Sequence, residues 1–568
     1  MAFQLSPGVN VSEIDLTTIV PSVPTSIGAF AGPFAWGPVG VITTISDEVR
    51  LAATFGNPDS TVYEYWFSAA NFLAYSNNLK IVRAANIATT RNAVANTVAA
   101  AAVLISNDDD WLSNYSGGGV TRGEFAARYA GALGNSLKVS ICDVNTYSTW
   151  AYSGSFNSTP ATSTYVSNQG GANDEIHIVV VDEDGKFTGT QGTVLEKYGY
   201  VSKASDAKDD SGNTNYYKNV LANKSKYIHW LSHPTGNTAA TYANASSTWG
   251  SAASNISFTK LIANVTLSLA SGADGTISTA NVVTAYDLFD PAESVDINLV
   301  ISGPADATVA TSLISMAETR KDCLVFLSPS KANCVDNASD EVTDIKTYRD
   351  TLTSTSYAVL DSNWKYQYDK YNDVYRWVPL NGDIAGLCAR TDLERDPWFS
   401  PGGLNRGIIK NAIKLAWNPT KTNRDDLYVK GINPVVSFQG EGIVLFGDKT
   451  LLSKPSAFDR INVRRLFIVL EKAIARAARF SLFEFNDQFT RASFVNLVEP
   501  FLRDVQGRRG IYDFRVVCDE SNNTPEVIDR NEFVGDIYIK PARSINFIQL
   551  NFVAVRTGVS FDEVVGKF

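Results

Sequence analysis

The sequence contains few of the residues that most often carry catalysis or cross-links. Among its 568 residues are three His, two Met and five Cys. The number of cysteines is odd, they lie far apart and no CxxC pair occurs, so the sequence favours free thiols in a reducing compartment over a disulfide framework or a zinc site. Three histidines leave few candidates for a general base, and no GxSxG segment is present. We therefore expect no cofactor, no metal and no enzymatic activity.

The start of the chain lacks the features of a targeting segment. Its first residues, MAFQLSPGVNVSEID, contain no basic n-region and no apolar h-region. Residues 16–46 carry no charge, but Pro21, Pro24, Pro33 and Pro38 exclude a membrane-spanning helix there. We expect a protein that is made in a cytosol and does not insert into a membrane.

A strong basic charge is also missing. The formal net charge is −10, although residues 401–568 hold 24 Lys and Arg side chains against 19 Asp and Glu. Residues 1–400 are therefore the acidic part of the chain. A nucleic-acid-binding protein needs a much stronger basic field, so we expect no nucleic-acid partner. An acidic body with a mildly basic C-terminal third suits a protein whose two ends face different surroundings.

The order of the apolar segments predicts a multidomain protein of the α+β or α/β class. A chain of this length exceeds a single core, and two to four domains are expected. Residues 24–95 contain a small-residue strand, an aromatic-rich helix and a second strand, which predicts a mixed sheet covered by helices. The segments VDINLVISG and CLVFLSP are apolar strands of the parallel type, separated by a crossover helix. No repeat of 20–50 residues is evident.

Changes in amino-acid composition along the chain mark further regions within this fold. The ranges 96–175 and 235–280 are rich in Ser, Ala, Asn, Thr and Gly, which predicts an outer, loop-rich β insertion and a variable loop. The segment IHIVVVDEDG at 176–185 then returns to a buried strand. In chain order we expect an N-terminal arm at 1–20, the first part of a mixed-sheet core domain at 21–95, the β insertion at 96–175, the second part of the core domain at 176–400 with the variable loop at 235–280, and a C-terminal α+β domain at 401–568.

The clearest single helix is predicted from Asp459, in the N-cap position, to Phe485. Large apolar residues fall on one face of this helix, which predicts that the face is buried. The opposite face groups four cations within an arc of about 60°, and these are Arg465, Lys472, Arg476 and Arg479. Two interpretations stay open: a solvated face on a core helix, or a rigid row of cations aimed at an acidic partner.

Three patterns resemble catalytic or metal-binding motifs but depart from them at decisive positions. The segment 442–450 nearly matches a phosphate-binding loop, but Asp448 separates the second Gly from the Lys and adds a negative charge there. His229 and His233 are four residues apart, but Trp230 occupies the position where a metallohydrolase needs Glu. The acidic run at 108–110 lacks calcium-loop spacing. None of these patterns predicts a reaction.

Short motifs in a fixed order run across most of the chain. They are Pro7–Val9 with Glu13, Pro24–Ser26, Gly37–Pro38, Phe55–Gly56, Gly131 with Gly134–Asn135, Pro397–Gly403, Ile432–Pro434, Gly447–Thr450, Asn462–Arg465 and Asn522–Thr524. Together they resemble the tail sheath proteins of contractile-tailed bacteriophages. The ranges 140–175 and 235–280 do not match recognisably.

This resemblance implies a structural subunit of a virion tail sheath that is assembled in the cytoplasm of the host bacterium. Subunits would polymerise as hexameric rings, stacked helically around the tail tube protein between baseplate and tail terminator proteins. Contraction would drive the tube through the host envelope during genome delivery. The N-terminal arm and the C-terminal third would form the inner domain against the tube, and the 96–175 insertion would lie outermost.

The resemblance also implies that terminal arms join neighbouring subunits by completing a shared sheet. The residues expected in these contacts are Val9, Val11, Ile14 and Leu16 of the N-terminal arm, and Ile545, Phe547, Ile548, Leu550, Phe552 and Val553 of a C-terminal strand that is apolar on both faces and should lie within a sheet. The four helix cations would contact an acidic tube. Two alternatives stay open: a self-assembling shell or surface-layer protein without a contractile role, and a hydrolase of host glycans that binds through residues 96–175.

Overall fold

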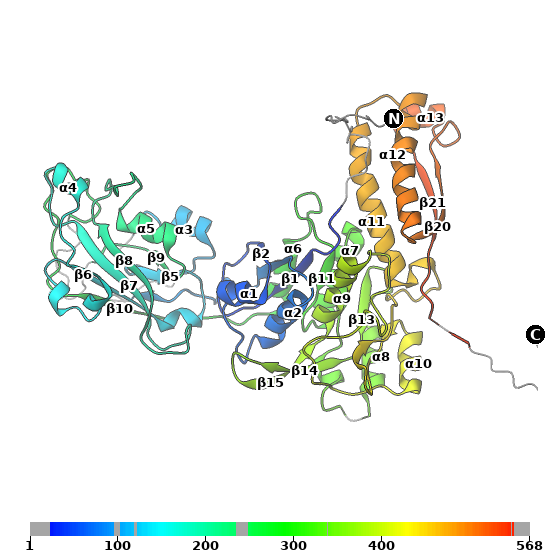
Figure 1. Cartoon of the computed structure of the whole chain (residues 1–568), viewed down its shortest axis with the longest axis horizontal. Helices are drawn as coiled ribbons and strands as arrows, with labels where there is room; N and C mark the ends of the chain where they lie inside the picture. Colours follow the sequence, from blue (N-terminus) through cyan, green and yellow to red (C-terminus); the bar gives the residue numbers. More distant parts are fainter. Residues whose placement is uncertain are drawn as a thin grey trace, which may run out of the picture.

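In the computed structural model, three regions follow one another along the longest axis of the molecule (Figure 1). A β-sheet lobe lies at one end, an α/β body in the middle, and two long helices with a hairpin at the other end. The structure describes residues 23–95, 103–118, 122–234, 248–337, 339–546 and 548–549. The predicted multidomain mixture of α and β structure is confirmed.

The body is built on a seven-stranded sheet that is parallel except for one edge strand. In spatial order the strands are β17 (Ile432–Asn433), β13 (Ala358–Asp361), β12 (Leu324–Leu327), β11 (Leu299–Ile301), β1 (Gly28–Gly32), β3 (Leu79–Arg83) and β2 (Thr43–Ile45). Only β2 runs antiparallel to its neighbour. The crossover helix predicted between β11 and β12 is confirmed as α7 (Ala307–Arg320), which Asp306 caps through the backbone N–H groups of Thr308 and Val309.

Helices cover both faces of this sheet. The helices are α1 (Glu48–Phe55), α2 (Tyr63–Leu73) and α9 (Asn381–Glu394) on one face, and α6 (Thr279–Asp287), α7, α8 (Glu341–Asp350) and α10 (Lys421–Val429) on the other. Alternate strand residues point to opposite faces, so Phe30 and Phe326 join the first core while Ala29 and Val325 join the second. Burial on both faces explains why these strands read as continuous apolar runs.

Small residues allow the helices to approach the sheet and one another closely. A Cβ atom on Gly28 in β1 would lie 2.6 Å from the ring of Phe72 in α2. A Cβ atom on Gly382 in α9 would lie 2.1 Å from the carbonyl oxygen of Ser68 in α2. The small-residue character of the first strand therefore reflects helix packing.

The lobe contains a second seven-stranded sheet, which is antiparallel. Its strands in spatial order are β8 (Thr193–Ser202), β7 (Glu175–Asp182), β6 (Leu137–Asp143), β10 (Val265–Ala270), β4 (Val94–Ala95), β5 (Phe125–Ala127) and β9 (Ile228–Trp230). The short helices α3 (Asp108–Asn114), α4 (Thr164–Asn168) and α5 (Tyr217–Lys224) accompany it. The strand expected to re-enter the core at 176–185 lies here instead, because β7 pairs with β6 and β8.

The chain enters and leaves the lobe at one narrow neck. Arg91 and Ala273 exchange two backbone hydrogen bonds, of 2.8 and 3.0 Å between nitrogen and oxygen. Next to them, the Thr90 hydroxyl donates to the carbonyl oxygen of Asp274 over 2.8 Å. The lobe is thus an insertion between β3 and α6 of the body, closed at its base by a pair of antiparallel segments.

Two smaller sheets complete the body. β14 (Trp364–Asp369) pairs with β15 (Val374–Pro379) and β16 (Lys414–Leu415), and β18 (Val435–Phe438) pairs with β19 (Gly442–Leu445). The segment 442–450, which departs from a phosphate-binding loop, begins with strand β19, as its β-branched residues Ile443 and Val444 favour.

Candidate functional site

The C-terminal region consists of two helices and a hairpin. α11 (Ile461–Ala478) and α12 (Gln488–Gly507) lie side by side, and β20 (Ile511–Val517) and β21 (Asp536–Pro541) cover α12; the short α13 (Pro525–Asp529) lies in the loop between the two strands (Figure 1). Their shared core contains Leu466, Leu470 and Ile474 of α11, Phe494, Val498 and Leu502 of α12, and Ile511 of β20. The buried apolar face predicted for α11 is confirmed.

The ends of α11 differ from the prediction. The helix begins at Ile461, with Arg460 in the N-cap position, and Asp459 lies in a preceding 3₁₀ turn. The backbone N–H of Ile461 donates to the carbonyl oxygen of Asp448 over 2.8 Å, so a distant backbone group serves the helix start. The helix ends at Ala478 and not at Phe485.

The hairpin β20–β21 has two open edges. Among the residues that the structure describes, these strands pair only with each other. Phe514 and Val516 lie opposite Ile539 and Ile537, and these four side chains pack toward the helices. Both outer edges carry backbone N–H and C=O groups that can accept a further strand.

Both chain ends attach to this region. Val23 packs against Ala473 and Ala477 of α11, as Leu497 of α12 does. At the other end, the backbone N–H of Ala542 donates to the carbonyl oxygen of Gly510 over 3.1 Å. The two terminal segments therefore start from the same two-helix unit.

Most residues predicted for the arms lie outside the described part of the chain. This holds for Val9, Val11, Ile14, Leu16, Phe547, Leu550, Phe552 and Val553. Ile545 and Ile548 are described; they belong to no strand and are 82% and 78% exposed. The described part of the C-terminal segment thus turns apolar side chains to solvent, and these two residues do not lie within a sheet of their own subunit.

The expected row of exposed cations on α11 is wrong for Arg465. This side chain is 4% exposed and forms an ion pair with Asp392 of α9, with 2.6 Å between Nη2 and Oδ2. It also donates to the carbonyl oxygens of Cys388 and Thr25, over 3.2 and 3.3 Å. Burial opposes the charge on Arg465, but the Asp392 carboxylate outweighs it and raises the pKa of the guanidinium. Arg465 therefore joins α11, α9 and the N-terminal segment.

Lys472 and Arg476 also find carboxylates within the subunit. Both pair with Asp296, which precedes β11; the Nη2 of Arg476 lies 2.8 Å from its Oδ2. Lys472 lies 3.5 Å from Asp322 as well. Burial alone would raise the pKa of Asp296, but hydrogen bonds and charge from the two cations lower it. These pairs bind the outer half of α11 to the body.

An exposed apolar tip connects α11 to α12. Its large side chains are between 62% and 104% exposed, and they are Phe480, Leu482, Phe483, Phe485 and Phe489. Arg479, at the end of α11, is exposed beside them, and no ion pair joins it to another described residue. Of the four predicted cations, only Arg479 and the partly exposed Arg476 remain accessible to a partner.

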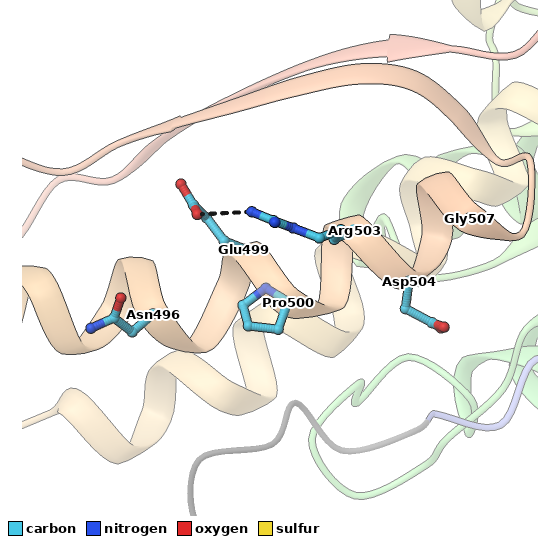
Figure 2. A pocket seen from close by; sticks show the side chains of 6 residues that line it. All are labelled: Asn496, Glu499, Pro500, Arg503, Asp504 and Gly507. Atoms are coloured by element: carbon cyan, nitrogen blue, oxygen red, sulfur yellow. Dashed lines mark ion pairs between the residues drawn. The ribbon is translucent and has the colours of Figure 1, made fainter.

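A groove of about 660 Å³ runs along α12 (Figure 2). The six described residues that line it all come from this helix: Asn496, Glu499, Pro500, Arg503, Asp504 and Gly507. Glu499 and Arg503 form an ion pair of 3.7 Å one turn apart, and no further polar groups converge with them. The groove is an open helix surface and lacks the converging groups of a catalytic site.

A second cavity, of about 360 Å³, lies where β1 and β11 end. Open α/β sheets often bind ligands at such a position. Here the carboxylates already serve the fold: Asp59 accepts from Thr61, Asp274 accepts from the backbone N–H of Ala132, and Asp306 caps α7. The cavity therefore offers no set of unused catalytic groups.

The five cysteines and His229 lie in the interior of the molecule. All five cysteines are buried and unpaired, and burial raises the pKa of Cys388 to about 12. His229 stacks on Trp111 with 5.1 Å between ring centroids. Within the described ranges, no group of three or more His, Cys, Asp or Glu side chains could hold a metal ion. No helix there is long and apolar enough to cross a membrane.

Comparison with known families and sequences finds relatives over the whole length of the chain. The family model "Phage tail sheath protein central domain" matches residues 275–451, and "Phage tail sheath C-terminal domain" matches residues 453–554. The tail sheath protein of Vibrio phage KVP40 is 35% identical over 99% of this chain and 100% of its own length. The tail sheath protein of Enterobacteria phage T4 is 34% identical over 99% of each chain.

Solved structures agree on the fold. The sheath tail protein from Desulfitobacterium hafniense matches with a TM-score of 0.52 and 12% identity, over 91% of this chain and 94% of its own. The helical sheath of the anti-feeding prophage in its contracted state matches with a TM-score of 0.51 and 13% identity, over 97% and 99%. The family is structural, in agreement with the expectation that the chain is not an enzyme. The chain belongs to the phage tail sheath protein family and is a subunit of a contractile tail sheath.

Proposed function

We propose that this subunit polymerises by exchanging its terminal arms with neighbouring subunits. The assembly would be a helical stack of hexameric rings around the tail tube, bounded by baseplate and tail terminator proteins. Its contraction would drive the tube through the host envelope and deliver the genome. The energy would come from the metastable extended lattice and not from a nucleotide.

The open hairpin carries this proposal. Among the described residues, β20 and β21 form a sheet of two strands that packs on α12 and leaves both outer edges unpaired, and an unpaired edge can accept a further strand. Both chain ends start from the same unit, so each subunit can offer arms and accept them. A strand that adds nine residues at about 0.5–1.5 kcal/mol per backbone hydrogen bond would contribute several kcal/mol per link. Such links can persist while looser polar contacts between subunits slide.

The order of the three regions along the molecule supports the assignment of one end to the inside of the sheath and the other end to its outside. The two-helix unit and the β lobe lie at opposite ends of the molecule (Figure 1). We assign the two-helix unit to the tube side and the lobe to the outer surface of the sheath. Arg476 and Arg479, the accessible members of the predicted cation row, would contact an acidic tube surface. Such a contact is screened over about 8 Å at physiological salt and releases readily.

Electron microscopy of three chains tests the arm exchange. The full chain, a chain without residues 1–20 and a chain without residues 547–568 are each added to isolated tail tubes. We expect decorated tubes from the full chain and undecorated tubes from both truncated chains, which should stay folded by circular dichroism. Normal sheaths from both truncated chains would refute the exchange.

Charge reversal tests the tube contact separately. Arg476→Glu with Arg479→Glu should weaken tube decoration at low salt, where charge contacts are strongest. Arg503→Glu with Arg530→Glu is the matched control, because it makes the same charge change at exposed positions in the same region. Equal decoration by both variants at low salt would show that the α11 cations do not face the tube.

Membership in the sheath family argues against the two alternatives. A surface-layer protein or a glycan hydrolase would not share 34–35% identity over its full length with tail sheath proteins. No observation in the described residues favours either alternative.

A further inference from the structure

The densest cluster of polar contacts around the C-terminal segment centres on Asp448. This residue follows β19 and is 3% exposed. Its carboxylate accepts hydrogen bonds from five side chains: Ser400, Tyr428, Arg460, Ser544 and Asn546. A carboxylate offers about four lone-pair sites, so this one is fully used. The donors come from four separate parts of the chain, which meet at a single buried charge.

Two of these donors belong to the C-terminal segment. The Ser544 hydroxyl lies 2.6 Å from one oxygen of Asp448, and the Asn546 side-chain amide lies 3.1 Å from the other. The same amide donates to the Tyr428 hydroxyl over 3.1 Å. Ile545, between them, is 82% exposed. In an extended chain, alternate residues face opposite sides, so the polar pair faces the subunit while the apolar residue faces outward.

The remaining donors make the receiving side rigid. Arg460 lies 3.2 Å from Asp448 and 2.6 Å from the Tyr428 hydroxyl, and it directly precedes α11. Its guanidinium forms an ion pair with this buried carboxylate, and hydrogen bonds between such partners are stronger than those between neutral groups. The cluster thereby joins the start of α11, the end of α10 and the C-terminal segment.

We infer that Asp448 is a positioning residue that clips residues 544–546 to the subunit and so fixes the direction in which the C-terminal arm leaves it. Polar contacts hold this segment on the subunit, because Ile545 and Ile548 are exposed and do not pack on it. The inference rests on the proposed arm exchange. A fixed departure point reduces the conformational freedom that the arm loses when it joins a neighbour, and such preorganisation strengthens binding.

Trypsin cleavage after the exposed Arg543 measures the clip in the full-length free subunit. A protease needs an extended, released segment, and the clip should protect this bond. Ser544→Ala with Asn546→Ala should raise the rate of this cut at least about tenfold, since two hydrogen bonds to a charged group are lost. Ser544→Thr keeps the hydroxyl and, with Asn546 unchanged, should be cut as slowly as the original chain. Ser521→Ala, which removes an exposed hydroxyl bonded to Asp519, is the matched control and should change nothing.

Decoration of isolated tail tubes then tests the role of the clip. The double variant should keep the thermal stability of the subunit but form fewer and shorter sheaths than the chain with Ser544→Thr. An unchanged rate of cleavage would overturn the clip, and faster cleavage with normal sheaths would overturn its positioning role. The proposed arm exchange fails by a different result, normal sheaths from both truncated chains.

Discussion

Replacing Arg465 by Met tests the buried ion pair that joins α11 to the body. Arg465 and Asp392 are each 4% exposed at the side chain; Oδ2 of Asp392 accepts from Arg465, and Oδ1 has no hydrogen-bond partner in the described structure. After the replacement, the Asp392 carboxylate stays buried without a counter-charge. Removal of one partner of a buried pair costs about 3–5 kcal/mol.

A second estimate gives the same magnitude. The uncompensated carboxyl can take up a proton, and protonating an Asp of ordinary pKa of about 3.9 at pH 7 costs about 4 kcal/mol. This penalty shrinks by about 1.4 kcal/mol for each pH unit below 7. The pKa of Asp392 in the folded variant would be raised, so the variant loses stability as pH rises and regains it as pH falls.

Labelling of Cys388 is the assay, because Arg465 donates to the carbonyl oxygen of this buried residue. A local probe is needed since a chain of several domains does not unfold in one step. A cost of 3–5 kcal/mol predicts labelling that is about a hundred to a few thousand times faster at pH 7. The double replacement Arg465→Met with Asp392→Leu should recover most of this loss.

Arg476→Met is the matched control, because its partner Asp296 keeps Lys472 and the pair is partly exposed. Its cost should stay below about 1 kcal/mol, or about fivefold in the labelling rate. If the Arg465 variant labels no faster than this control at pH 7, the argument that this buried charge needs its partner is refuted.

Three further predictions follow from burial and exposure. Burial raises the pKa of Asp361 to about 8. Between about pH 4 and 8 this group is protonated in the folded chain and ionised in the unfolded chain, so the stability of the fold falls as pH rises through that window. Asp361→Asn should therefore raise the unfolding temperature more at pH 8 than at pH 5. Gly382→Ala places a Cβ atom 2.1 Å from a backbone oxygen of α2 and should cost about 1–3 kcal/mol or more in thermal unfolding, whereas Gly507→Ala, with open space around it, should be neutral. Phe483→Ser with Phe485→Ser should leave stability within about 0.5 kcal/mol and reduce the binding of an apolar dye by the free subunit, since both side chains are largely exposed.

Periodicity predicted α11 and its apolar face, but it did not predict which side chains pair with the charged face. A helical pattern shows which side chains share a face, and it does not show what another part of the chain places against that face. Asp392 lies 73 residues before Arg465, and Asp296 lies 176 residues before Lys472. No signal near the helix could have revealed these partners. Glu471, the acidic residue closest in sequence to Lys472 on α11, forms an ion pair with none of the four predicted cations.

Apolar runs similarly predicted strands better than they predicted sheets. The segment that contains β7 reads as a buried strand from its composition alone, and that prediction is confirmed. Its sheet depends on pairing with β6 and β8, which share no distinctive pattern with it. The Ser- and Asn-rich composition marked the first and last parts of the lobe but not the strands β7 and β8 between them. The residues that the prediction assigned to arm contacts mostly lie outside the described chain, and their role stays a prediction.

The narrow neck at Arg91 and Ala273 makes the β lobe a replaceable cassette. Its entry and exit are one hydrogen-bonded pair apart, so a foreign domain with adjacent termini can occupy the same opening without stretching the body. Natural variation in length and sequence can accumulate there while the body and the two-helix unit keep their dimensions. For engineering, the neck is the position at which an enzyme or antigen could be carried at regular spacing along a phage tail.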